Sequence, residues 1–170
     1  PEDRLKTGLA PEASVNENLM MGYQHKKPYE GLGMKLNKKA ISQKTAQLIR
    51  QFDIRTPSGQ TRVKSLSGGN MQKLVVAREF SFDSPILIIA QPTRGLDVGA
   101  IEFIHRLIID MRDAGRAILL VSADLDEIFR LSDRIVTIYE GKLTGEFRTA
   151  DVTKQEIGLY MTGKNLSTAG

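Results

Sequence analysis

Hydrophobic residues are spaced differently in the two parts of the chain. Up to about residue 82, apolar side chains recur every three or four positions among polar ones, which is typical of amphipathic helices. Beyond that point, short continuous apolar runs appear at residues 86–90 and 117–121. Such runs are typical of strands that are buried on both faces of a parallel sheet. The pattern predicts a helical front part followed by an α/β part.

Capping residues and turn formers set the expected limits of the front helices. Ser14 and Glu17 have the spacing of a capping box, in which each side chain bonds a free amide of the other. We expect a helix from there to about Lys26. A connector rich in proline and glycine follows at residues 27–36. A second amphipathic helix is expected over residues 37–53.

Strands and helices are expected to alternate in the second part. We predict strands at residues 86–90, 117–121, 134–139 and 143–147, and helices that begin after Asp97, Asp124 and Thr153. This alternation is typical of a parallel sheet with covering helices. Ligands of such sheets bind beyond the carboxyl ends of the strands, so chemistry is expected at those ends.

A serine and two glycines precede the apolar helical pattern of residues 71–82. Ser67 is suited to cap this helix, and Gly68 and Gly69 have no Cβ that would hold a ligand away from the backbone amides. Free amides and the positive end of the helix dipole favour a phosphate group. A serine-glycine cap is also an ordinary helix start, so this stretch alone does not identify a site.

The composition excludes several classes of site. No cysteine is present, which excludes disulfides, thiolate metal sites and cysteine nucleophiles. His25 and His105 are too far apart in the sequence to suggest a histidine-rich metal site. No apolar run approaches the roughly 18 residues of a membrane span, and no charged-then-apolar leader is seen at Pro1. We expect neither a spanning segment nor a secretion signal.

The net charge of +4 is unevenly distributed. Residues 1–78 carry 14 Lys and Arg against 6 Asp and Glu, whereas residues 79–170 carry 10 against 14. A basic front part fits nucleic acid, a membrane surface, a phosphorylated ligand or simply a solvated helical surface. No recognition helix or aromatic platform accompanies the charge, so the solvated surface is favoured over nucleic acid.

Three stretches, in this order, resemble the motifs of an ABC transporter ATP-binding subunit. Residues 66–73 resemble its signature motif, residues 86–100 its Walker B motif with the D-loop, and residues 121–127 its switch region. The resemblance begins at residues 1–4 and continues to about Phe147. It is closest to the C-terminal half of the double-length subunits that serve simple-sugar and nucleoside importers.

Residues 90–105 resemble the nucleoside branch of that family in particular. The resemblance implies an α/β fold: a partial P-loop NTPase core of the ABC type, with a parallel sheet and a basic helical subdomain. Residues 1–65 would form mostly the helical subdomain with a preceding loop. Residues 66–147 would hold the signature helix and the core, and residues 148–170 a C-terminal helix and tail.

The sequence departs from the family pattern where catalytic groups are expected. In a working half, an aspartate at the end of the Walker B strand holds the water shell of magnesium, and the next glutamate orients or deprotonates the attacking water. Here these residues are Ala90 and Gln91, and Ala123 replaces the switch histidine. Alanine offers a cation no oxygen, and glutamine is not a base. We expect no metal ligand and no intact catalytic residue in this half.

The phosphate-binding Walker A loop is missing from the sequence. No Gly-x-x-x-x-Gly-Lys-Ser/Thr pattern occurs in the 170 residues. In the family, this loop lies upstream of residues 1–4, and its strand lies between the strands expected at 117–121 and 134–139. The resemblance therefore implies a fragment that alone neither binds ATP tightly nor hydrolyses it. We expect its sheet to rearrange, to associate or to depend on further chain.

The signature motif, in contrast, is intact. In this family two ATP-binding halves pack head to tail, and the signature of one half covers the nucleotide held by the other. The resemblance implies that Ser67, Gly68, Gly69 and Asn70 face the γ-phosphate of ATP bound with Mg²⁺ at the partner half. Asp97, in the D-loop, would cross the interface to steady that site, although it is equally suited to capping its own helix.

The resemblance also implies partners and a location. The full assembly would contain the other ATP-binding half, two membrane permease subunits and, indirectly, an extracytoplasmic solute-binding protein. It would lie peripherally on the cytoplasmic face of the cell membrane, and ATP and Mg²⁺ would bind only there. The transported solute is not specified by this subunit.

Two other functions stay open at this point. One is a non-transport ABC-type ATPase that acts on nucleic acid through the basic front part. The other is an interaction module that only docks a permease. The simple-sugar type of signature and the replaced catalytic groups argue against the first, and we expect no nucleic acid partner.

Overall fold

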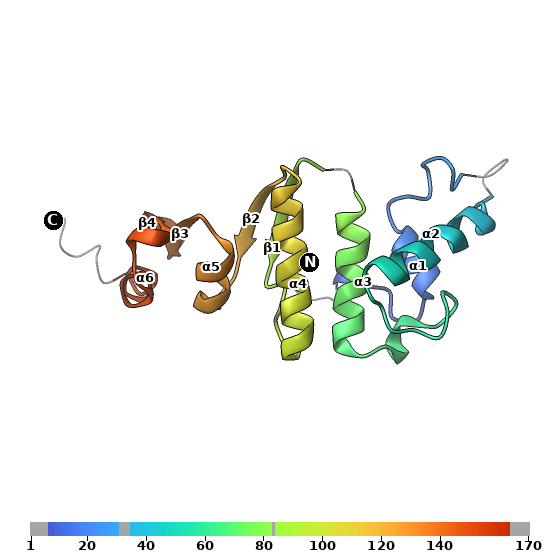
Figure 1. Ribbon diagram of the computed structural model, residues 1–170, viewed down its shortest axis with the longest axis horizontal. Helices are drawn as coiled ribbons and strands as arrows, with labels where there is room; N and C mark the ends of the chain where they lie inside the picture. Colours follow the sequence, from blue (N-terminus) through green and yellow to red (C-terminus); the bar gives the residue numbers. More distant parts are fainter. Residues whose placement is uncertain (1–6, 31–34, 83, 164–170) are drawn as a thin grey trace. The chain divides into compact units, whose positions relative to one another are not determined.

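The computed structural model describes residues 7–30, 35–82 and 84–163 (Figure 1). The first residues of the family resemblance, 1–4, lie outside this described part. Contacts divide the chain into two compact units, Pro1–Ile118 and Leu119–Gly170. The three-part division expected from the resemblance stays a prediction. None of the described helices combines the length and the apolar character needed to cross a bilayer.

The first helix is shorter than expected. α1 (Val15–Met20) begins with the predicted capping box, in which Glu17 N donates to Ser14 Oγ at 3.2 Å and Ser14 N donates to Glu17 Oε2 at 2.7 Å. The expected extension to about Lys26 is wrong. Met21 leaves the helical conformation, and Gly22 has a φ of +86°, which is incompatible with a continuing right-handed helix.

The second helix confirms its prediction. α2 (Lys38–Gln51) is capped by Asn37, whose Oδ1 accepts from Ala40 N at 3.1 Å. It contains lysines and an arginine but no acidic residue, so it contributes to the basic character of the front part. α1 packs against both α2 and α3 (Gly68–Phe80). The 3-10 helix η2 (Val63–Ser65) leads into α3.

α3 supplies much of the core of the first unit. Most of its residues from Met71 to Phe80 are buried, and Leu74 is 1% exposed. Buried apolar side chains from the rest of the first unit complete the core: Val15, Leu19, Ile41, Leu48, Phe52, Ile54, Val63, Ile104 and Ile108. The start of α3 therefore continues directly into a buried, well-packed part of the same helix.

A strand-helix-strand unit follows α3. β1 (Ile86–Ala90) and β2 (Ala117–Val121) form a two-stranded sheet and are joined by α4 (Val98–Asp113). Ala117 N donates to Pro85 O at 2.9 Å, so both strands begin at the same edge and run parallel. The α/β class and the small parallel sheet are confirmed.

The expected burial of these strands on both faces is wrong. Ile86 and Ile88 of β1 are 61% and 74% exposed, and Leu119 and Val121 of β2 are 56% and 50% exposed. Alternate side chains of a strand point to opposite faces. On the other face Leu87 is buried, whereas Ile89, Ile118 and Leu120 are partly exposed.

The second unit is a hairpin with two helices. It contains α5 (Leu125–Leu131), β3 (Arg134–Tyr139), β4 (Lys142–Arg148), the 3-10 helix η3 (Thr149–Asp151) and α6 (Lys154–Met161). β3 and β4 are antiparallel, with Ile135 opposite Phe147. Ile128, Ile135 and Ile157 form the buried core.

The third expected strand does not extend the parallel sheet. β3 pairs with β4 in a separate sheet, whereas β2 pairs with β1. Among the described residues, β2 and β3 thus have different partner strands, and the expected rearrangement or association of the sheet stays a prediction. The helix limits at Asp124 and Thr153 are as predicted, because both residues cap their helices.

Candidate functional site

Ser67 and its neighbours form a capped helix start. Ser67 has extended backbone angles, with φ −66° and ψ 158°, and its Oγ accepts hydrogen bonds from Asn70 N at 3.4 Å and Asn70 Nδ2 at 2.9 Å. The amides of Gly68 and Gly69 belong to the first turn, where backbone N–H groups have no intrahelical acceptor. These amides and the helix dipole make this end attractive to an anion.

The loop after α2 is tied to the same helix start. Arg55 N donates to Asn70 Oδ1 at 2.7 Å. One turn further along α3, Lys73 Nζ bonds Asp53 O at 2.9 Å and Asp53 Oδ2 at 2.7 Å. The hydrogen bond from Lys73, and then its charge, lower the pKa of the Asp53 carboxyl. Sequence reasoning missed both ties, because partners 15 and 20 residues apart leave no periodic signal.

The start of α4 lies beside the start of α3. Asp97 caps α4, and its Oδ1 accepts from Ala100 N at 2.9 Å. A Cβ placed on Gly69 would lie 3.5 Å from Ala100 Cβ and 3.6 Å from Asp97 Oδ2. Lys73 Nζ lies 4.5 Å from the centre of the Phe103 ring, which joins the two helices again one turn further on. The structure thus brings Asp97 together with the Ser67–Asn70 stretch.

The two residues at the end of β1, Ala90 and Gln91, have no titratable side chain. β1 ends at Ala90, and Gln91 follows with a φ of +49° in a turn closed by Arg94 N donating to Gln91 O at 3.3 Å. Mg²⁺ prefers carboxylate oxygens, which neither side chain has. The residues present here do not fit this ion, and no hydrolytic step is assigned to them.

The switch position belongs to the second unit. Ala123 precedes Asp124, whose N donates to Ser122 Oγ at 3.0 Å and whose Oδ1 accepts from Asp126 N at 2.8 Å. These bonds start α5. A methyl group at residue 123 can neither donate nor accept a proton, so it offers nothing to a phosphate oxygen.

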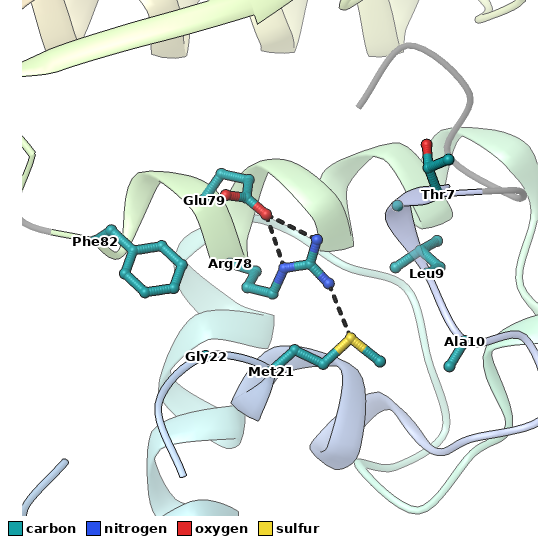
Figure 2. Close-up of a pocket in the computed structure, with 9 residues that line it drawn as sticks. Thr7, Leu9, Ala10, Met21, Gly22, Arg78, Glu79 and Phe82 are labelled. Carbon is teal, nitrogen blue, oxygen red and sulfur yellow. Dashed lines mark hydrogen bonds and ion pairs between the residues drawn. The ribbon is translucent and has the colours of Figure 1, made fainter. Parts of the chain in front are cut away.

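A separate cavity lies toward the other end of α3 (Figure 2). Its volume is about 400 Å³, and its lining residues are Thr7, Gly8, Leu9, Ala10, Met21, Gly22, Arg78, Glu79 and Phe82. Arg78 is 7% exposed, and its guanidinium donates to Glu79 Oε1 at 2.9 Å and to Met21 Sδ at 3.3 Å. Beside it, Tyr23 stacks on Phe82, and burial is the main cause that raises the pKa of Tyr23 to about 12. This arginine is already paired, and nothing here resembles a phosphate cradle.

Curated relatives match between 94% and 100% of the chain. It is 46% identical over 170 residues to the guanosine import ATP-binding protein NupO of Bacillus subtilis, covering all of this chain and 33% of that protein. It is 43% identical over 167 residues to the nucleoside import ATP-binding protein NupA of Lactococcus lactis, covering 98% of the chain and 33% of NupA. A ribose import ATP-binding protein, RbsA of Clostridium tetani, is 38% identical over 159 residues, covering 94% of the chain and 31% of RbsA.

The chain therefore spans about one third of the length of the curated relatives it matches. No protein-family model matches it. Among solved structures, the dimeric bacterial ABC transporter cassette MJ0796 superposes with a TM-score of 0.68 at 22% identity, over 83% of this chain and 59% of that one. The cassette MJ1267, in its ADP conformation, superposes with a TM-score of 0.64 at 17% identity, over 93% of this chain and 62% of that one. These structures are similar to it in fold.

Proposed function

Because the chain belongs to the ABC-type ATP-binding proteins, we propose that it works as part of the ATP-binding subunit of an importer for nucleosides or simple sugars. The observation that carries the proposal is the 46% identity to a guanosine importer subunit over the entire chain. A relative named for guanosine import is 46% identical to the chain, whereas one named for nucleoside import and one named for glucose import are both 43% identical. The preference for nucleosides over sugars therefore rests on the guanosine import relative and on the resemblance of residues 90–105 to the nucleoside branch.

Within that subunit, this part would cover a nucleotide held by a partner half. The start of α3 offers a hydroxyl, at Ser67, and two glycine amides that can meet phosphate oxygens. Asp97, close beside Gly69, would steady the same interface from the start of α4. ATP would supply the binding energy and the chemistry of the transport cycle, with Mg²⁺ held by the partner half.

The catalytic groups of its own site would be degenerate. Ala90, Gln91 and Ala123 provide no magnesium ligand, no general base and no titratable partner for the γ-phosphate. Each double-length subunit would then contain one competent and one degenerate ATP site. Hydrolysis at the competent site would be coupled to transport through two permease subunits at the cytoplasmic face of the membrane, with an extracytoplasmic binding protein delivering the solute.

The test is the ATPase activity of the complete subunit assembled with its permease. Replacing Ser67 with Asp adds a negative charge where the γ-phosphate would lie and removes a donor, so we expect the rate to fall about a hundredfold or more. Ser42→Asp, on the exposed side of α2, is the matched control and should leave the rate nearly unchanged. Unaltered turnover in the Ser67 variant would refute the covering role.

A further inference from the structure

The amide side chain of Asn70 lies between the loop after α2 and the hydroxyl of Ser67. Its Oδ1 accepts from Arg55 N at 2.7 Å, and its Nδ2 donates to Ser67 Oγ at 2.9 Å. The reverse orientation of this amide would set its NH₂ group against the Arg55 N–H, donor against donor. The backbone of Arg55 therefore fixes which end of Asn70 meets Ser67.

Asn70 also determines which hydrogen bonds remain for the Ser67 hydroxyl. A serine oxygen has two acceptor lone pairs and one donor proton. Asn70 occupies both acceptor positions, through Nδ2 at 2.9 Å and through its backbone N–H at 3.4 Å. The hydroxyl is thus set to donate, and no described residue accepts its proton. An oriented donor of this kind suits an anionic oxygen, because it needs no reorganisation when the anion arrives.

Resting on the proposed function, we infer that Asn70 is a positioning residue that acts through Ser67. It holds the Ser67 O–H as a donor toward the γ-phosphate, and it links that orientation to the loop at Arg55. The adjacent bonds from Lys73 to Asp53 anchor the same loop to α3. Displacement of residues 53–55 would free the Asn70 amide to turn and would weaken the contact with the nucleotide.

A double-mutant cycle on the assembled transporter tests this relay. The ATPase rate is measured with Mg-ATP for Ser67→Ala, Asn70→Ala and the double variant. We expect a loss of roughly a hundredfold for Ser67→Ala and about tenfold for Asn70→Ala. Because Asn70 acts through the serine, the double variant should be no slower than Ser67→Ala alone. If Asn70 were needed only for folding, the loss of ATPase rate in the double variant would instead equal the product of the two single losses.

The outcomes separate the relay from the proposed function. If Ser67→Ala leaves the rate unchanged, the proposed covering role itself fails. If Ser67→Ala is slow but Asn70→Ala is not, or if the two losses multiply, only the relay fails. Gln47→Ala, an amide removed from the exposed side of α2, is the control and should match the unmodified assembly. Circular dichroism of each variant confirms that α3 is retained.

Discussion

α3 and β1 are neighbours in sequence and differ in both packing and chemistry. α3 buries almost its whole length, whereas β1 leaves Ile86 and Ile88 exposed. The N-terminus of α3 has a capping serine, Ser67, and the backbone amides of two glycines, whereas β1 ends at Ala90 and is followed by Gln91. The helix is supported by residues within this chain, and one face of the strand is not covered by any described residue.

The difference shows which parts of the site this chain can build alone. Ser67 and Asn70 are tied to Arg55, and Gly69 lies beside Asp97, so the helix end is fixed by contacts inside the first unit. At the end of β1, Ala90 and Gln91 carry no charge. Under the proposed function, the helix end serves a partner's nucleotide, and the strand end serves none.

The largest expected contrast is in stability. Leu74→Ala opens a cavity at a side chain that is 1% exposed, so the free energy of unfolding should fall by about 3 kcal/mol. Ile88→Ala removes similar atoms from a side chain that is 74% exposed and should cost less than about 1 kcal/mol. Urea denaturation of both variants, followed by circular dichroism, measures the two losses. Equal losses would mean that the face of β1 is covered in solution, for instance by a second copy.

Local patterns predicted the elements well, and tertiary context explains the errors. Capping boxes at Ser14 and Thr153 and the caps at Asn37, Ser67 and Asp97 gave the right helix starts, because a cap is decided by neighbours within four residues.

The end of α1 was missed because it depends on the left-handed conformation of Gly22, for which an internal glycine is only a weak signal. Burial of β1 was predicted wrongly because an apolar run shows that a strand is suited to burial but not that its partner belongs to the same chain. In the candidate site, the sequence singled out Ser67, Gly68, Gly69, Asn70 and Asp97, and their role toward a nucleotide stays a prediction. The ties to Arg55 and Asp53 depend on packing between distant segments.

A smaller contrast concerns charge. Lys73→Met removes the ion pair with Asp53 and also the contact between the Lys73 ammonium and the Phe103 ring. Because the Asp53 side chain is 64% exposed, the ion pair should contribute less than about 1 kcal/mol to the loss of unfolding free energy at pH 7.

The pH dependence of that loss has a definite sign. Lys73 lowers the pKa of folded Asp53 below its ordinary value of 3.8. The stabilisation is therefore present above that value and is lost as the pH falls through the lowered pKa. The difference in unfolding free energy between Lys73→Met and the unmodified chain should narrow to the parts contributed by the carbonyl of Asp53 and the ring of Phe103. Urea denaturation from pH 7 to pH 2 checks this, and an Asp53→Asn background should show no such narrowing. β1 has no charged side chain, so the Ile88→Ala effect should not change in this way.

The smallest expected effect comes from restoring the missing groups. Ala90→Asp, Gln91→Glu and Ala123→His together return a magnesium ligand, a base and an imidazole, yet the 170-residue chain should still show no ATP turnover. The reason is that no phosphate-binding loop occurs in its sequence, so the γ-phosphate has no donors to hold it in line with an attacking water. Isothermal titration with Mg-ATP should show no micromolar binding for either the original chain or the triple variant. A saturable ATP isotherm or phosphate release by the original chain would show that the strand end is competent after all, and the contrast with α3 would then have to be abandoned.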